Sequence, residues 1–155
     1  MHNLLKHIKK YIKIILFSFI GLFFVSSSNA ELTIEEIVKS RQALFSKNYS
    51  TAKRVQSFSS KGDFEKAKKL IIEMSENYKV LIDLFPENTQ EGFDTEALLT
   101  IWDEKDDFNE LMQKASDDMI KLVSVIENAD DIRGTLTKFM WSNCKACHNS
   151  YREEH

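Results

Sequence analysis

Two cysteines and a histidine lie close together near the end of the chain. Cys144, Cys147 and His148 form a C-x-x-C-H segment, which is the attachment signature of a c-type haem. On a helix, residues three and four positions apart share one face, so both thiols can bond to the vinyl groups of one haem. The adjoining imidazole can then reach the iron from the same side. The segment therefore predicts one covalently attached haem c, with His148 as the metal ligand.

Other uses of these residues fit the sequence less well. A disulfide between Cys144 and Cys147 would be strained within a helix. A thioredoxin-like redox pair belongs beside a βαβ unit, and the sequence predicts no such unit. A zinc site would need more ligands, and only His148 and His155 are nearby. The alternative of another class is a secreted helical module without a cofactor.

The first 30 residues have the pattern of an export signal. Lysines at positions 6, 9, 10 and 13 precede an apolar run over residues 14–25, and small side chains follow at Ser28 and Ala30. An uncleaved membrane anchor is the alternative, but a span needs about 20 apolar residues, which is more than this run supplies. We predict a signal peptide over 1–30 that is cleaved after Ala30, and a periplasmic protein made of residues 31–155.

Helices are predicted throughout residues 31–155. This part contains a single proline, Pro86, and apolar residues recur at helical spacing. Thr33 and Glu36 form a capping box where the first helix should begin. Asp63 is a suitable N-cap for the second helix, which Pro86 should end. Asp103 is expected to cap the third helix.

The links between these helices predict the topology. Polar turns over 57–62 and 128–131 are short, whereas the connection over 86–102 is longer. Short links force neighbouring helices to run antiparallel. The fold is therefore expected to be all-α, an antiparallel up-down-up-down four-helix bundle in one domain, residues 31–155.

The charge balance excludes some function classes. The whole chain has a formal net charge of −3, and the charged side chains of residues 1–30 are all lysines, four in number, so residues 31–155 carry −7. Such a surface would repel nucleic acid phosphates and suits docking on a basic protein partner. In the acidic pairs Asp106–Asp107 and Asp117–Asp118, the two neighbouring side chains point in different directions on a helix, so they are expected on the surface rather than in a catalytic pair. The sequence has no nucleophile–base arrangement and no phosphate-binding loop, so an enzyme is not predicted.

The C-terminal block resembles that of the cytochrome c′ family, the class II c-type cytochromes. The block is CKACHNSYR, residues 144–152. The Arg41–Gln42 pair also matches the family, and residues 84–86 and 101–102 match it more weakly. The resemblance implies a four-helix bundle with the haem motif in its last helix. It also implies five-coordinate, high-spin iron, and dimers formed through the first two helices.

The resemblance assigns roles to three further residues. Phe45, four residues after Arg41, would crowd the open face of the iron, although its periodicity alone favours an ordinary core residue. Arg41 lies on the apolar side of its helix, where an unpaired charge is costly, and a haem propionate would be its partner. Arg152, one helical turn after His148, would shield the proximal side of the iron; without the resemblance it would be a solvated residue.

Two haem functions then compete. The first is binding of small gases, nitric oxide above all and also carbon monoxide, at a five-coordinate iron. The second is electron transfer with a redox partner protein through a low-spin iron that has a methionine as sixth ligand. The predicted first helix contains no methionine, which favours the first function. The remaining methionines, at positions 74, 112, 119 and 140, are expected to fill the core.

Overall fold

The structure is a computed structural model that describes residues 32–154. The predicted export signal, its cleavage after Ala30 and the terminal His155 lie outside the described residues. Within that range none of the helices is both long and apolar enough to cross a bilayer.

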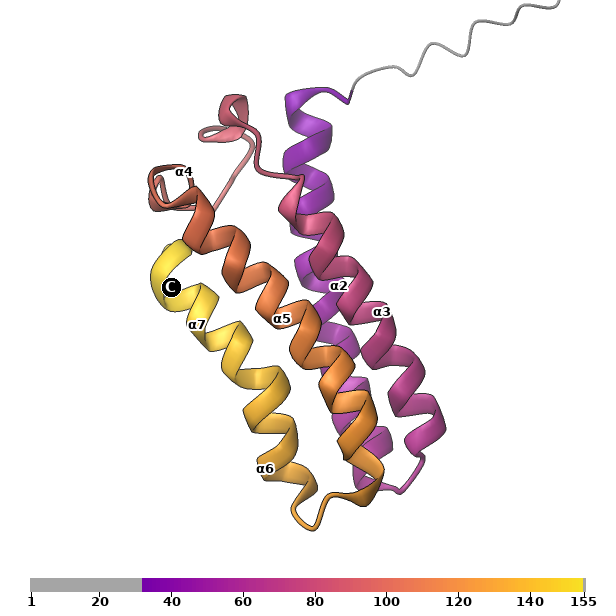
Figure 1. Ribbon diagram of the computed structural model, residues 1–155. Helices are drawn as coiled ribbons and strands as arrows, with labels where there is room; N and C mark the ends of the chain where they lie inside the picture. The colour runs from indigo at the N-terminus through magenta and orange to yellow at the C-terminus, as the bar shows by residue number, and fades with distance from the viewer. Residues whose placement is uncertain (1–31, 155) are drawn as a thin grey trace, which may run out of the picture. The chain divides into compact units, whose positions relative to one another are not determined.

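Four long helical segments make up the described fold. They are α2 (Ile34–Ser60), α3 (Phe64–Ile82), α5 (Lys105–Val125) and a last segment that joins α6 (Ile132–Leu136) to α7 (Ser142–Tyr151) through a π-turn, Thr137–Trp141. Shorter pieces are η2 (Glu87–Thr89), α4 (Thr100–Asp103) and η3 (Ile126–Asn128). The long segments run alternately down and up (Figure 1). The predicted all-α, up-down-up-down four-helix bundle is confirmed.

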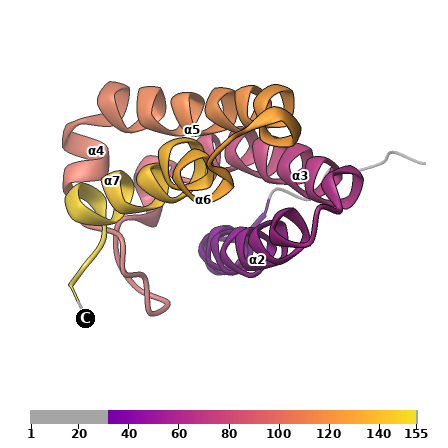
Figure 2. The same ribbon diagram turned by 90° about the horizontal axis from the view of Figure 1, so that it is seen from below.

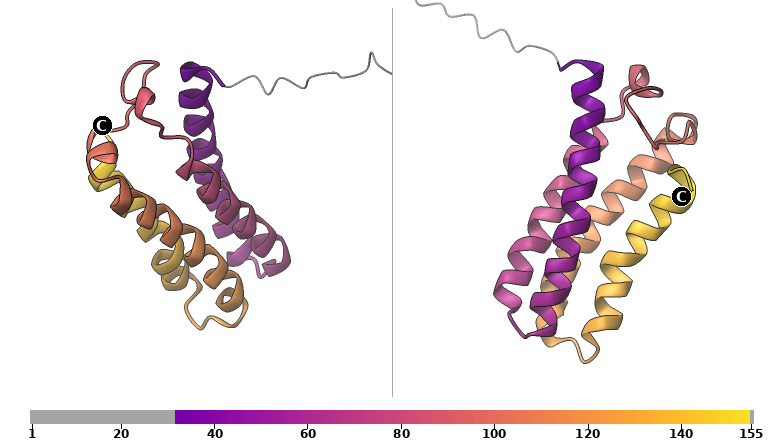
Figure 3. Two further views of the ribbon diagram at one scale, coloured as in Figure 1. Left: turned by 45° about the horizontal axis from the view of Figure 1, so that its top comes forward. Right: turned by 180° about the vertical axis from the view of Figure 1, so that it is seen from behind.

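The helices form a closed ring around the core. α2 packs on α3, α3 on α5 and α5 on α7, while α6 returns to α2 (Figure 2). In the right-hand view of Figure 3, α2 lies beside the last helical segment at its α6 end, and the two diverge toward α7. Large apolar side chains fill the space between them, and they include Val55, Ile71, Met74, Leu81, Phe108, Met119, Leu122, Ile126 and Met140. All four methionines expected in the core are buried.

The ends of the helices follow local side-chain chemistry at two of the predicted starts. Thr33 and Glu36 form the predicted capping box: the Glu36 N–H donates to Thr33 Oγ1 at 3.2 Å, and the Thr33 N–H donates to Glu36 Oε2 at 2.8 Å. Asp63 caps α3 by accepting from the Lys66 N–H at 3.4 Å. Both predictions are confirmed.

Other predicted boundaries were wrong. The first helix continues to Ser60, through most of the expected turn, and α3 ends at Ile82, before Pro86 is reached. Asp103 does not cap the third helix; it ends the short helix α4, and Glu104, with φ −116° and ψ 45°, precedes α5. The reason is that Ile101 and Trp102 are buried, which pulls one extra helical turn onto the core ahead of α5.

Candidate functional site

One cavity collects the six residues that the sequence assigned to a haem site. It measures about 660 Å³, within the roughly 300–1,000 Å³ that is usual for ligand pockets. Its wall is built from α2, α3, α4, α5, α7, the connection before α4 and the residue after α7. The candidate residues in this wall are Arg41, Phe45, Cys144, Cys147, His148 and Arg152. Residues more than 100 positions apart in the sequence are thus brought to one site.

The two cysteines lie on α7 and face this cavity as free thiols. The Tyr78 hydroxyl lies 3.9 Å from Cys144 Sγ. Burial raises the pKa of both thiols, and for Cys147, where the neighbouring Cys144 adds to the effect, the pKa reaches about 12. Redox-active cysteine pairs instead have a lowered pKa, because the thiolate is the nucleophile. The protonated state of these thiols therefore disagrees with a thioredoxin-like pair.

His148 lines the cavity beside the thiols and keeps an exposed edge. Burial lowers the pKa of its imidazole, and the positive charge of Arg152 lowers it further. The ring is therefore neutral at neutral pH, which leaves a nitrogen lone pair for a metal. Among residues 32–154 no three His, Cys, Asp or Glu side chains cluster as ligands for a bare metal ion. The zinc alternative thus lacks a ligand set in this part of the chain.

Arg152 lies beyond the last helix. We expected it one helical turn after His148, but α7 ends at Tyr151 and Arg152 is extended, with φ −129° and ψ 144°. Its Nε lies 3.7 Å from Glu96 Oε2, and the backbone of Ala97 pairs with that of Arg152 in an isolated antiparallel bridge. The predicted helical placement was wrong because this pairing draws the chain end to the loop. Arg152 nevertheless reaches the cavity and acts on the charge state of His148.

Arg41 is a buried cation with neutral partners. Only 2% of the residue is exposed. Its guanidinium donates to Leu84 O at 3.2 Å, Thr89 Oγ1 at 2.8 Å, Thr89 O at 2.9 Å and Thr95 Oγ1 at 2.7 Å. It also lies 4.5 Å from the centroid of the Phe85 ring. Burial lowers its pKa to about 10, so it stays protonated at neutral pH.

Within residues 32–154, the charge of Arg41 has no carboxylate opposite it. Among residues 32–154, no aspartate or glutamate forms an ion pair with this guanidinium. A buried charge usually has a partner of opposite sign, since its desolvation is costly. Arg41 lines the cavity, so an anionic group of a ligand there would supply that partner.

Phe45 and Met112 occupy the apolar wall. Phe45 is half-buried on α2, and its ring meets Phe85 edge-on with centroids 6.4 Å apart. Met112, on α5, is 1% exposed and belongs to the core as expected, but it also lines the cavity. Tyr78 and Asn143 line the cavity too, and neither they nor Met112 had been expected in the site. Only Asn143 could have been noticed in the sequence, because it is a polar residue directly before the cysteine motif.

The chemistry of this wall fits a covalently held haem. Two thiols and an imidazole lie on one helix end, a buried cation without a counterion lies in the wall, and most of the remaining wall is apolar. Porphyrins present the matching groups: two vinyls, an iron, two propionates and an apolar ring. The fold and site together define a four-helix-bundle protein of the c-type cytochrome class.

The chain belongs to the cytochrome c′ family. The family model described as Cytochrome C′ matches residues 36–152, and members of this family hold one covalently attached c-type haem and are electron-transfer proteins. Cytochrome c′ of Rhodopseudomonas palustris is 29% identical over 84 residues; the match covers 54% of this chain and 57% of that protein, little more than half its length.

Solved structures agree with this assignment. A cytochrome c′ structure from Rhodopseudomonas palustris is 25% identical, with a TM-score of 0.65, and covers 76% of this chain and 96% of its own. Another cytochrome c′, described as having an unusual ligand-controlled dimer dissociation, has a TM-score of 0.71 at 15% identity and covers 81% of this chain and 100% of its own. The second likeness shows the fold alone.

Proposed function

We propose that Cys144 and Cys147 hold the haem through thioether bonds and that His148 is its axial ligand. The observation that carries this proposal is that all three side chains face one cavity of sufficient size. The raised pKa of the two thiols agrees with it, because buried, protonated thiols resist stray oxidation until the haem is attached. When bound, the haem supplies an iron that changes between the ferric and ferrous states.

The other residues of the site bind and tune this group. Arg41 offers its uncompensated charge to a propionate, while its hydrogen bonds to Thr89 and Thr95 hold the connection that closes this side of the cavity. Arg152 disfavours protonation of His148, so the imidazole stays available to the iron.

On the face of the iron opposite His148, we propose an open position that Phe45 guards. A phenyl ring cannot ligate iron, but it can exclude water and yield to a small uncharged molecule. Phe45 is only half-buried and has free space beside it in the cavity, so its ring can move. The ligand that this site suits is nitric oxide, with carbon monoxide as a probe. We assign the protein a binding and redox role rather than an enzymatic one.

A second candidate function is electron transfer through six-coordinate iron. Met112 favours it, since this thioether lines the cavity. A matched pair of variants separates the two: Met112→Leu removes a cavity thioether, and Met119→Leu removes a buried one that does not line the cavity. If Met112 is the sixth ligand, only Met112→Leu converts a low-spin ferrous spectrum to a high-spin one. If the iron is five-coordinate, both variants keep the spectrum of the unmodified protein.

Export and assembly complete the proposal. We place the protein in the periplasm, after cleavage behind Ala30, with a basic redox protein as partner. A homodimer through α2 and α3 would cover the exposed apolar side chains Tyr49, Ile72 and Val80. The relative with ligand-controlled dimer dissociation is a precedent for both a ligand and a dimer. Sedimentation of the protein with and without Ile72→Lys tests this: a dimer that persists unchanged would exclude a contact through Ile72.

Peptide mapping tests the attachment directly. The protein is expressed with haem-attachment machinery, digested, and the haem-bearing peptide is sequenced by mass spectrometry. We expect the haem on the peptide that contains residues 144–148, and no covalent haem in the Cys144→Ser, Cys147→Ser double variant. A colourless product in which the two cysteines form a disulfide would exclude a cytochrome.

A further inference from the structure

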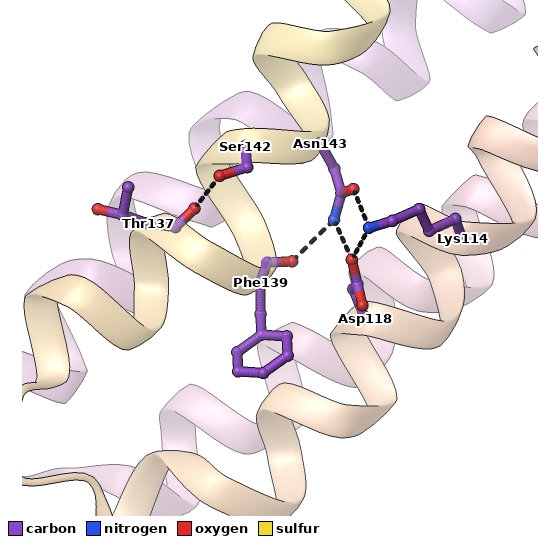
Figure 4. A network of polar contacts seen from close by, with 6 residues as sticks. All are labelled: Lys114, Asp118, Thr137, Phe139, Ser142 and Asn143. Carbon is purple, nitrogen blue, oxygen red and sulfur yellow. Dashed lines mark hydrogen bonds and ion pairs between the residues drawn. The ribbon is translucent and has the colours of Figure 1, made fainter.

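The last helical segment contains a π-turn just before the cysteine motif. The Thr137 carbonyl accepts from the N–H of Ser142, five residues later, and from Ser142 Oγ at 2.7 Å (Figure 4). A π-turn holds one residue more than an α-helical turn. The turn ends at Trp141, two residues before Asn143 and three before Cys144.

The buried face of the last helical segment runs through this turn into the cysteine motif. Before the turn, the core face carries Leu136 and Met140, both buried. After the turn it continues through Asn143 and Cys147, three and seven residues after Met140, and both are buried. Cys144 and His148 lie beside this face; Cys144 is half-buried, His148 is exposed, and both line the cavity. Whatever holds the buried Asn143 in place therefore also orients Cys144, the next residue.

Asn143 meets a polar pair on α5. Its Nδ2 donates to Asp118 Oδ2 at 3.0 Å and to the carbonyl of Phe139, within the π-turn, at 2.9 Å (Figure 4). Its Oδ1 accepts from Lys114 Nζ at 3.3 Å, and Lys114 also forms an ion pair with Asp118. One side chain, itself only 5% exposed, thus links the π-turn to α5.

The charge state of Asp118 suits this role. Burial alone would raise the pKa of its carboxyl group, but hydrogen bonds from Lys114 and Asn143 outweigh burial and hold the pKa below its ordinary value. The group is therefore an ionised acceptor at neutral pH. Breaking a hydrogen bond to such a partly buried charge is more costly than breaking a neutral one.

We propose that the contact of Asn143 with Asp118 fixes how α7 lies against α5 after the π-turn and so orients Cys144 and His148 for the haem. They are positioning residues, because neither would touch the iron. The inference rests on the proposed function of the cysteine motif. It adds a polar contact between α5 and the last helical segment as a determinant of haem attachment and of the direction of the axial imidazole.

An exchange of the two side chains tests the pair without changing volume. Asn143→Asp removes the donor and places two carboxylates together, and the double variant Asn143→Asp, Asp118→Asn restores a donor and an acceptor in reversed order. Asp117→Asn is the control, because Asp117 is an exposed neighbour on α5 whose side chain accepts from Gln113 of the same helix. The readouts are the fraction of chains with covalent haem and the circular dichroism of the haem band in the purified holoprotein.

We expect Asn143→Asp to reduce the attached fraction at least threefold and to alter the haem-band dichroism of the molecules that do attach it. The double variant should recover both values in part, because it restores the contact between the two helices but an aspartate at position 143 cannot donate to Phe139 O. Asp117→Asn should leave both values unchanged. Attachment and dichroism that stay at the original values in Asn143→Asp would overturn the inference, as would a double variant that recovers neither. If the unmodified protein attaches no haem at Cys144 and Cys147, the proposed function itself fails, which is a separate result.

Discussion

Truncation of Phe45 to alanine should let small ligands reach the iron faster. Phe45 lies on the cavity-facing side of α2, and its ring is held by an edge-on contact with Phe85 at a centroid distance of 6.4 Å. A ligand that binds on this side has to displace the ring and break that contact. Alanine removes both the obstacle and the contact.

The size of the effect follows from the ring contact. An aromatic pair at this separation contributes about 0.5–1.5 kcal/mol beyond its buried area. If displacement of the ring is part of the barrier, Phe45→Ala lowers the barrier by about that amount. Since about 1.4 kcal/mol corresponds to a factor of ten in rate, association should become roughly two- to tenfold faster.

The assay is carbon monoxide association with the ferrous protein, followed by stopped-flow absorption. Phe58→Ala is the matched control, because Phe58 is a partly buried phenylalanine on the same helix that does not line the cavity. Its association rate should equal that of the unmodified protein. An unchanged rate in Phe45→Ala, or an equal increase in both variants, would refute the assignment of Phe45 as the residue that guards the iron.

Three further predictions concern stability, each measured by urea unfolding. Arg41→Leu should reduce the free energy of unfolding by about 3 kcal/mol, because the buried oxygens of Thr89 lose their donors. Arg41→Lys should be destabilised as well, since an ammonium group lacks the forked geometry of the guanidinium. A loss under about 1 kcal/mol in Arg41→Leu would contradict this prediction. The depressed pKa of the Asp118 carboxyl group stabilises the fold fully at pH values above its ordinary pKa of about 3.9, and this stabilisation disappears as the pH falls through the lower pKa of the folded state. The free energy of unfolding of Asp118→Asn should therefore depend less on pH in this acid range. Trp102→Phe should cost about 1 kcal/mol through the lost hydrogen bond, 3.1 Å, from its indole to Pro86 O, and an unchanged midpoint would show that this bond is dispensable.

The sequence predicted those features that depend on local chemistry. Thr33 with Glu36 is a reciprocal pair within four residues, and Asp63 caps its own helix, so neither needs tertiary information. The four-helix topology followed from short links between apolar stripes. The cysteine motif could be recognised because its two cysteines and histidine lie within five consecutive residues.

Features that depend on tertiary contacts were missed. The four acceptors of Arg41 lie in the connection between α3 and α4, 43 to 54 residues away, and periodicity carries no information about a loop of this kind. The π-turn was not predicted, because it is stabilised by Asn143 and Asp118, which lie on different helices. Arg152 left the helix because it pairs with a distant loop. In each case the decisive partner was remote in sequence.

The absorption spectrum of the purified protein, ferric and then ferrous, before and after addition of carbon monoxide, tests the central claim most directly. An iron bound by His148 and open beneath Phe45 predicts broad high-spin bands and a large shift of the ferrous spectrum with carbon monoxide. A sharp low-spin ferrous spectrum that does not respond to carbon monoxide would contradict an open face and would assign the sixth position to a protein ligand, with Met112 as the first residue to replace.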